Sequence, residues 1–301
     1  MITVSAPGKI HLMGEHAVVY GKPALLSAIN KRLSVTVSSS TTGLVLKSIE
    51  PTDYLQTIVE IVMKHIHITQ KPDIIVTVTS DIPAGYHLGS SAAVSVATVG
   101  ALLFYFKKIW NPTLINQLAY EAEKVKHGNP SGGDNTACTF GGLLWYRKEL
   151  ECLKSMWQLP FKSKLNKFYL VDTGKPNETT GDMVSYVHSR YAVNRFKFNK
   201  LFDENEEQVK RIAEALKSGN EKELVDAIRR GEWTLERMGV VSKIAQARIR
   251  KIESSGGAAK ILGGGGRKAG VGFLLCYAQK TPAGATPILL GEEGVRLEER
   301  V

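Results

Sequence analysis

The chain has 301 residues, of which 43% are hydrophobic and 23% are charged, the composition of an ordinary folded, soluble protein. Its length is enough for a sizeable core and predicts two domains or one large one. The net charge is +10, but lysines and arginines are spread along the chain rather than gathered in blocks, which disfavours nucleic acid as a partner.

The cysteines and the apolar segments bear on the location of the protein. Cys138, Cys152 and Cys276 are widely spaced and form no CxxC pair, which indicates reduced, mostly buried thiols rather than a disulfide framework or a zinc site. The N-terminus lacks the apolar core of a signal peptide. The charge-free run Ser91–Phe106 is shorter than the ~20 residues of a membrane-spanning helix. We therefore expect a buried helix there, a cytoplasmic protein and no membrane partner.

The N-terminal half alternates predicted strands and helices. Period-two alternation and β-branched residues predict strands, at Ile2–Ser5, Leu33–Ser38, Leu44–Ile49 and Asp73–Thr79. Apolar residues at helical spacing predict a helix over Asp53–His65. The tripeptide Asn111-Pro112-Thr113 is a start signal for a helix over Leu114–Lys126, and the Gly- and Pro-rich segment His127–Asn135 is predicted to be a loop.

The C-terminal half opens with a predicted strand, Lys167–Asp172. Helices are then predicted at Glu178–His188, Phe202–Ser218, Glu221–Met238 and Ser242–Ser254. A glycine cluster, Gly263–Gly266, precedes a strand at Gly272–Tyr277, and two final segments, Pro287–Leu290 and Gly294–Glu298, are predicted to form a terminal hairpin or two edge strands. Because strands and helices interleave throughout, the chain is predicted to fold as α+β or α/β in two lobes.

The stretch PAGYHLGSSAA, Pro83–Ala93, joins a predicted strand to the apolar helix. A helix N-terminus attracts phosphate through unpaired N–H groups and a partial positive charge. Gly85 and Gly89 can take φ > 0 and let an anion approach the backbone, and the hydroxyls of Ser90 and Ser91 can bind phosphate or a metal ion. Spacing alone favours a plain strand-to-helix turn with a serine N-cap, because no Walker A motif is present.

Two further segments concentrate groups that suit phosphoryl transfer. The segment SAPGKIHLMGEHAVVYG (5–21) contains Lys9, Glu15 and His16. The segment HGNPSGGDN (127–135) contains Asp134, and Glu123 lies shortly before it on the preceding predicted helix. Taken singly, Lys9 is a solvated lysine, His16 a structural histidine, Asp134 a turn residue and Glu123 a surface glutamate. Taken together, they supply a cation for the transferring oxygens, a Ser-plus-Glu ligand pair for a hard cation and a carboxylate for the acceptor hydroxyl.

The chain resembles the GHMP kinase superfamily and, within it, the mevalonate kinases. The three segments quoted above are similar to the first motif, the ATP-phosphate loop and the catalytic loop of that family. DTGKPNETT (172–180) resembles the stretch that opens the second domain, and AAKILGGGGRKAGVG (258–272) occupies the place of the third, glycine-rich motif. The match covers most of the chain in order. It implies the two-lobed α+β GHMP fold, with an N-terminal domain of 1–165, a C-terminal domain of 166–301, and ATP and substrate bound between the lobes.

The resemblance also implies roles for individual residues. Asp134 would be the catalytic carboxylate beside the 5-hydroxyl of mevalonate, and Lys9 would lower the pKa of that hydroxyl or stabilise the transferring charge. Glu15 would hold the framework of the substrate site, while His16 and Thr180 would contact the substrate. ATP would be bound by Gly85, His87, Leu88, Gly89, Ser90, Ser91 and Ala92. Mg²⁺ would be held by Ser91 and Glu123.

Several residues depart from the family pattern. His87 stands where the family has a loop glycine, and Tyr86 precedes it. If position 87 needs φ > 0, histidine is permitted at a cost, and its side chain either points outward or adds a protonated imidazole beside the phosphates. Leu262 replaces a hydroxyl residue, and Arg267 and Lys268 replace glycines, so these two cations either reach phosphate or the substrate carboxylate or stay solvated.

The activity expected from the resemblance is ATP- and Mg²⁺-dependent phosphorylation of mevalonate to 5-phosphomevalonate in isoprenoid biosynthesis. One alternative is another GHMP small-molecule kinase acting on a related isoprenoid precursor. A second is a nucleotide-binding regulator without catalysis, suggested by Tyr86, His87 and Leu262. Whether Asp134 is a general base or an electrostatic and positioning group stays open, as does the oligomeric state, although dimers are common among such enzymes.

Overall fold

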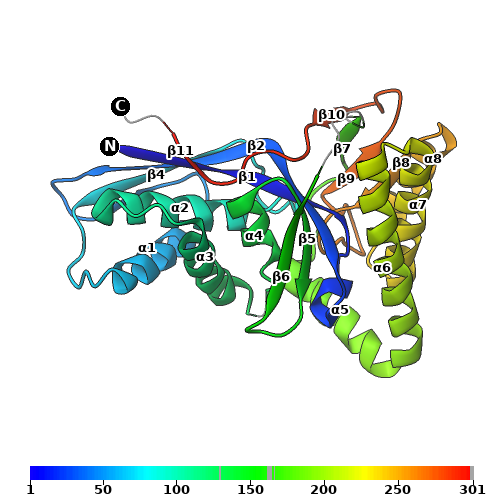
Figure 1. The fold of residues 1–301 in the computed structure, drawn as a ribbon, viewed down its shortest axis with the longest axis horizontal. Helices are drawn as coiled ribbons and strands as arrows, with labels where there is room; N and C mark the ends of the chain where they lie inside the picture. Colours follow the sequence, from blue (N-terminus) through cyan, green and yellow to red (C-terminus); the bar gives the residue numbers. More distant parts are fainter. Residues whose placement is uncertain (129, 161–164, 166, 299–301) are drawn as a thin grey trace.

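The structure is a computed structural model that describes residues 1–128, 130–160, 165 and 167–298 (Figure 1). The described strands form two sheets, a larger one ordered β11-β1-β2-β4-β3, to which β5 and β6 add beside β2, and a smaller one ordered β10-β7-β9-β8. The larger sheet contains β1 (Ile2–Met13), β2 (Ala24–Ser39), β3 (Val45–Lys47), β4 (Ile74–Ser80), β5 (Leu143–Lys148), β6 (Lys154–Leu159) and β11 (Arg296–Leu297). The smaller sheet contains β7 (Phe168–Asp172), β8 (Ala258–Ile261), β9 (Phe273–Tyr277) and β10 (Ala285–Ile288).

The helices divide between two lobes, although α6 of the second lobe also contacts β1 and β2 of the larger sheet (Figure 1). The first lobe has η1 (Ala17–Tyr20), α1 (Asp53–His65), α2 (Ser90–Lys107), α3 (Pro112–His127) and α4 (Gly133–Phe140). The second has α5 (Thr180–Val193), α6 (Arg195–Ser218), α7 (Glu221–Met238) and α8 (Lys243–Ser254). α2 packs on β1 and β2, while α7 and α8 pack on β8. The predicted α+β fold in two lobes is therefore confirmed.

Strand β1 is much longer than the predicted Ile2–Ser5, because it continues through Lys9 and His11 to Met13. Its antiparallel pairing with β2 shifts register between Pro7 and Gly8 and again between His11 and Met13. Proline is tolerated inside a sheet at such irregularities, and the two shifts hide the simple alternation that predicts a strand. The first motif is thus mainly a buried strand rather than a loop.

Helix α2 confirms the predicted buried helix. Most of its residues are buried, from Ala92 and Ala93 through Phe104, so it is apolar on every side as a core helix is. It is the one helix in the described part of the chain that is long and apolar enough to cross a membrane, by length and composition only. Core helices of soluble proteins pass the same test.

Other predictions differ from the structure at sheet edges and in loops. Strands β5, β6 and β8 and helix α4 were not predicted. The two final segments agree with the second predicted alternative, because β10 and β11 are edge strands that pair with β7 and with β1. Cys138 and Cys276 are buried free thiols and Cys152 is an exposed one, as expected for mostly buried thiols. The predicted domain boundary between 165 and 166 touches residue 166, which lies outside the described residues.

Candidate active site

A cavity of about 830 Å³ is lined by both lobes. It takes residues from β1, from the loop before α2, from α3, from the start of α4 and from the segment before α5. The predicted site residues that line it are Lys9, Glu15, His16, Gly85, His87, Gly89, Ser90, Ser91, Ala92, Glu123, Asp134 and Thr180. Leu88 does not line it; its side chain is buried, and its backbone carbonyl accepts a hydrogen bond from the backbone N–H of Lys9 at 2.9 Å.

Asp134 is the centre of a charged cluster in this cavity. Nζ of Lys9 lies 2.9 Å from Oδ2 of Asp134, and Nε2 of His11 lies 3.1 Å from Oδ1. Burial would raise the pKa of the Asp134 carboxyl, but the charge of Lys9 and the hydrogen bond from His11 outweigh it and hold that pKa well below its usual range. The carboxylate is therefore ionised at neutral pH, and its side chain keeps 40% exposure toward the cavity.

His11 was not predicted as a site residue. It lies two residues after Lys9 on β1, and residues i and i+2 of a strand point to the same face. If β1 is predicted at its full length, the two-residue alternation of a strand places the side chain of His11 beside that of Lys9. The tertiary structure adds that both side chains converge on a carboxylate more than a hundred residues away.

Asp134 lies in the first turn of α4 and not in the extended loop that the Gly- and Pro-rich composition predicted. Gly132, at φ 85°, precedes that helix, and a Cβ there would lie 2.9 Å from the hydroxyl oxygen of Tyr146. The same Tyr146 hydroxyl donates a hydrogen bond to the backbone carbonyl of Ser131 at 2.5 Å. The glycine is required by this tight contact, and the contact fixes where α4 begins and where Asp134 points.

The start of α2 is an uncapped helix N-terminus that faces the cavity. Gly89, at φ 81°, is the N-cap, and no side chain accepts a hydrogen bond from the first turn. The predicted alternative of a serine N-cap is therefore wrong, and both Ser90 and Ser91 lie inside the helix. A Cβ on Gly89 would lie 2.8 Å from Cγ of Lys9, so this glycine allows Lys9 to pass beneath the loop. Free N–H groups and two hydroxyls at one helix start suit an anionic ligand.

Ser91 and Glu123 lie together, as the resemblance implied. Oγ of Ser91 is 2.5 Å from Oε1 of Glu123, and the Tyr54 hydroxyl donates to the same oxygen at 2.5 Å. Burial and the neighbouring carboxylate raise the pKa of Tyr54, which keeps its hydroxyl protonated as a donor. A hydroxyl and a carboxylate are hard oxygen ligands that suit Mg²⁺. The described residues hold no cluster of three His, Cys, Asp or Glu for a metal, so this pair suits a cation that takes other ligands from phosphate and water.

Tyr86 and His87 both face the second lobe. The ring of Tyr86 packs on that of Phe273 in β9, with centroids 5.1 Å apart. His87 takes φ 64°, and its Cβ is 2.8 Å from the point where a Cβ on Gly263 would lie. Nδ1 of His87 is 3.4 Å from the Thr180 hydroxyl. Tyr86 and His87 therefore hold the loop before α2 against the second lobe, Tyr86 at β9 and His87 at the glycine-rich turn Gly263–Gly266.

The two expectations for the His87 side chain are both wrong. It does not point outward, because it lies between the lobes against the glycine-rich turn. It is also not a cation at neutral pH, since burial and the charge of Lys9 lower its pKa to about 4. Arg267 and Lys268 do not line the cavity and are exposed, with the Arg267 guanidinium 3.9 Å from the ring centroid of Tyr186. This favours the alternative in which they are solvated loop charges.

Glu15 and His16 connect the lobes from the end of the first motif. The buried carboxylate of Glu15 accepts a hydrogen bond from the buried ammonium of Lys260 on β8. His16, at φ 60°, has Nε2 3.1 Å from the carbonyl oxygen of Gly264. Burial lowers the pKa of His16, so the neutral ring donates this hydrogen bond through Nε2–H. The buried pair of Glu15 and Lys260 thus joins the end of the first motif to β8, and His16 joins it to Gly264.

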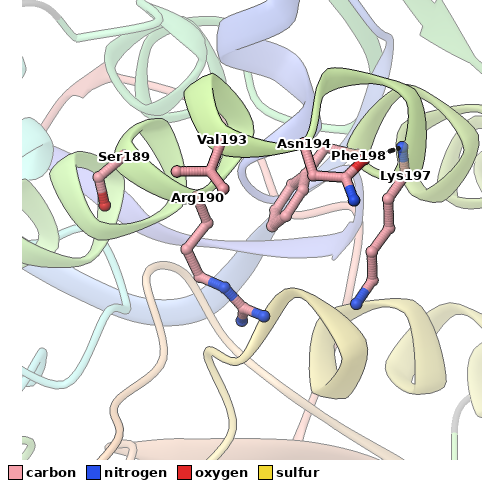
Figure 2. Close-up of a pocket in the computed structure, with 6 residues that line it drawn as sticks. All are labelled: Ser189, Arg190, Val193, Asn194, Lys197 and Phe198. Carbon is pink, nitrogen blue, oxygen red and sulfur yellow. Dashed lines mark hydrogen bonds between the residues drawn. The ribbon is translucent and has the colours of Figure 1, made fainter.

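A second, smaller cavity lies at the junction of α5 and α6 and contains none of the predicted site residues (Figure 2). Figure 2 shows Asn194 capping α6, where its Oδ1 accepts from the backbone N–H of Lys197 at 3.0 Å. Nη1 of Arg190 donates to the backbone carbonyl of Met238 at 2.7 Å. These contacts serve the packing of the helices, and the charged cluster around Asp134 lies in the larger cavity.

Comparison with known proteins identifies similar sequences and folds. The family described as GHMP kinases N terminal domain matches residues 53–142. Mevalonate kinase of Archaeoglobus fulgidus is 35% identical over 302 residues, covering 98% of this chain and 99% of that protein. Mevalonate kinase of Pyrococcus abyssi is 28% identical, covering 99% of this chain and 98% of that protein.

Two solved structures are similar in fold. The crystal structure of L. major mevalonate kinase in complex with R-mevalonate has a TM-score of 0.78 and 24% identity, covering 92% of this chain and 86% of that one. The crystal structure of the Methanococcus jannaschii mevalonate kinase has a TM-score of 0.76 and 21% identity, covering 98% of this chain and 96% of that one. At these identities the likeness concerns the fold.

Proposed function

Because the chain belongs to the mevalonate kinase family of the GHMP kinases, we propose that it transfers the γ-phosphoryl group of ATP to the 5-hydroxyl of mevalonate. The products are ADP and 5-phosphomevalonate. The observation that carries the proposal is that an uncapped helix N-terminus and an ionised carboxylate bound to a lysine line one cavity. Phosphoryl transfer needs these two features together, a site for the phosphates and an anionic partner for the acceptor hydroxyl.

The phosphates of ATP bind at the start of α2 in this proposal. The free N–H groups of the first turn and the hydroxyls of Ser90 and Ser91 donate hydrogen bonds to them. Gly85 and Gly89, at φ values of 81° each, keep the loop backbone open for the approach of an anion. His87 holds the loop in place through its contacts with the second lobe rather than by adding charge.

Asp134 acts mainly by orientation and charge. A carboxylate whose pKa is held well below its usual range is a weak base, so it accepts a hydrogen bond from the 5-hydroxyl and directs an oxygen lone pair toward the γ-phosphorus. Little base strength is required, because the transition state of phosphoryl transfer is loose and the hydroxyl passes its proton to Asp134 only late, once its oxygen bonds to phosphorus and becomes strongly acidic. Lys9 lies beside the same carboxylate and stabilises the negative charge that develops on the transferred group.

Mg²⁺ fits the pair of Ser91 and Glu123, whose oxygens are the hard ligands it prefers. When bound there with ATP, it neutralises charge on the phosphate oxygens. The Tyr54 hydroxyl orients the Glu123 carboxylate from behind. His16, at the end of the first motif, and Thr180, at the start of α5, contact mevalonate, and Glu15 holds His16 in place through the bond to Lys260. A cytoplasmic location and a homodimer stay predictions for the assembled enzyme.

The direct test incubates the purified protein with ATP, MgCl₂ and mevalonate, omits each in turn, and follows ADP and phosphomevalonate together. Equal, mevalonate-dependent formation of both products is the expected result. A panel with phosphomevalonate and related hydroxy acids tests the other GHMP activities. ATP binding without transfer to any member of the panel would reject the kinase assignment and favour a nucleotide-binding regulator.

A further inference from the structure

Three lysines line the large cavity, and two of them have protein partners. Lys9 binds Asp134 at 2.9 Å and keeps only 3% side-chain exposure. The ammonium of Lys126 lies 4.2 Å from the ring centroid of Tyr54, and burial lowers its pKa. For Lys175, no hydrogen bond, ion pair or aromatic contact is found among the described residues. Its ammonium is therefore the cavity lysine left available for a ligand.

Lys175 lies directly over the loop that precedes α2. Its Cε and Nζ are 2.7 and 3.3 Å from the point where a Cβ on Gly85 would lie. Gly85 itself lines the cavity, and its φ of 81° turns the loop backbone there. An ammonium beside a loop that leads into a helix N-terminus, and in the same cavity, is placed to bind phosphate oxygens together with that N-terminus.

The backbone before Lys175 is anchored to the second lobe. The N–H of Thr173 donates to the carbonyl of Gly272 at 3.0 Å, and the N–H of Gly272 donates to the carbonyl of Gly174 at 2.9 Å. The Thr173 hydroxyl donates to the same Gly272 carbonyl at 2.7 Å. Pro176 follows and restricts the chain further. Lys175 thus projects from a fixed point next to the glycine-rich turn rather than from a free loop.

The charges of the cavity explain why another cation is needed. Its lining contains five carboxylates, Glu15, Glu50, Glu123, Asp134 and Glu178, against three lysines. Glu15 is paired with the buried Lys260, and the carboxylates still outnumber the ammonium groups. Burial lowers the pKa of both His16 and His87, so these two rings add no positive charge at neutral pH. A triphosphate brings several further negative charges, and Lys9 is already bound to Asp134.

We propose that Lys175 binds the β- and γ-phosphates of ATP from the second lobe, so that the triphosphate is held between this ammonium and the start of α2. This inference rests on the proposed ATP site, but it does not require that mevalonate is the acceptor. It assigns nucleotide binding to a segment for which the resemblance implied substrate contact at Thr180.

The test measures dissociation constants of ATP, ADP and AMP by calorimetry, without mevalonate, for the wild type and three variants. Lys175→Gln removes the charge, and Lys175→Arg keeps it. Lys268→Gln is the matched control, since Lys268 is an exposed lysine of the same lobe outside the cavity. We expect Lys175→Gln to weaken ATP and ADP binding about tenfold, the effect of a lost charge-assisted hydrogen bond, and to leave AMP binding unchanged. Lys175→Arg and Lys268→Gln stay within about threefold of the wild type.

Other outcomes distinguish a failure of this inference from a failure of the proposed function. Equal weakening of AMP and ATP would mean that the substitution disturbs the site as a whole. Unchanged ATP binding with a raised KM for mevalonate would assign Lys175 to the substrate carboxylate instead. If the wild type binds ATP but phosphorylates no acceptor, the proposed function fails while the Lys175 result still stands. A wild type that does not bind ATP overturns both.

Discussion

The ammonium of Lys9 and the carboxylate of Asp134 form an ion pair, 2.9 Å apart, in which Lys9 is almost completely buried and Asp134 is not. The lysine comes from the middle of a strand of the larger sheet and the aspartate from the first turn of α4. Each is held by rigid secondary structure, so the carboxylate reaches the cavity in one orientation. The functional predictions that follow depend on this arrangement.

Replacing Asp134 by Asn keeps the size of the side chain and removes its charge. We expect kcat to fall by about 10² to 10⁴, because the acceptor hydroxyl loses the anionic partner that orients it. The dissociation constant of ATP should change little, since the start of α2 is untouched. Steady-state kinetics together with calorimetric ATP binding give both numbers, and near-normal turnover would reject the role of Asp134.

His11 is predicted to be a positioning residue for Asp134. Its Nε2 is 3.1 Å from Oδ1, so His11→Phe should allow the carboxylate to rotate and lower kcat about three- to tenfold, with the KM for ATP unchanged. The hydrogen bond also depresses the pKa of Asp134, and its loss should move any acid limb of kcat/KM to higher pH. His11→Asn, which keeps a donor, is expected to recover part of the rate. A purely structural role would lower stability without a change in the pH profile.

The metal site is predicted to depend on Glu123 and, less strongly, on Tyr54. Glu123→Gln should raise the Mg²⁺ concentration for half-maximal activity tenfold or more, since the carboxylate oxygen beside Ser91 is lost. Tyr54→Phe removes only the hydroxyl that orients this carboxylate, and a smaller shift in the same direction is expected. Mg²⁺ titrations at saturating ATP measure both. Equal Mg²⁺ requirements in the wild type, Glu123→Gln and Tyr54→Phe would place the metal elsewhere.

His87 should make the protein less stable in mild acid. Its pKa is lowered from 6.5 to about 4 by burial and by Lys9, so the unfolded chain binds a proton that the folded chain excludes. The stabilisation from the neutral buried ring is present above pH 6.5 and is lost as the pH falls toward 4. Between pH 7.5 and 4.5 the wild type should lose about 2 kcal/mol more unfolding free energy than His87→Asn, which tolerates φ > 0 and does not titrate. Denaturant unfolding at several pH values measures this, and parallel curves would contradict it.

Sequence patterns predicted helix bounds best for helices that bury a single apolar stripe along one face. Asp53–His65 and Glu221–Met238 have the predicted bounds, because apolar residues recur along one face and polar residues mark the ends. Sequence patterns did not predict the full length of strands in which register shifts break the alternation of side chains, as the two shifts in β1 do. They also failed at α4, a short helix whose start depends on the contact of Gly132 with Tyr146.

The sequence by itself determined the family, the α+β class and a set of candidate site residues, all of which except Leu88 line the cavity, because those depend on short motifs that lie within one segment. Only the tertiary structure decided which groups meet. His11 and Asp134 are 123 residues apart, and Lys260 and Glu15 are 245 apart. The placement of Lys175 over Gly85 and of His87 against Gly263 also joins segments of different lobes. Such contacts have no local signature, since they arise from packing two sheets and their helices around one cavity, and that packing also sets the charges of His87 and Asp134.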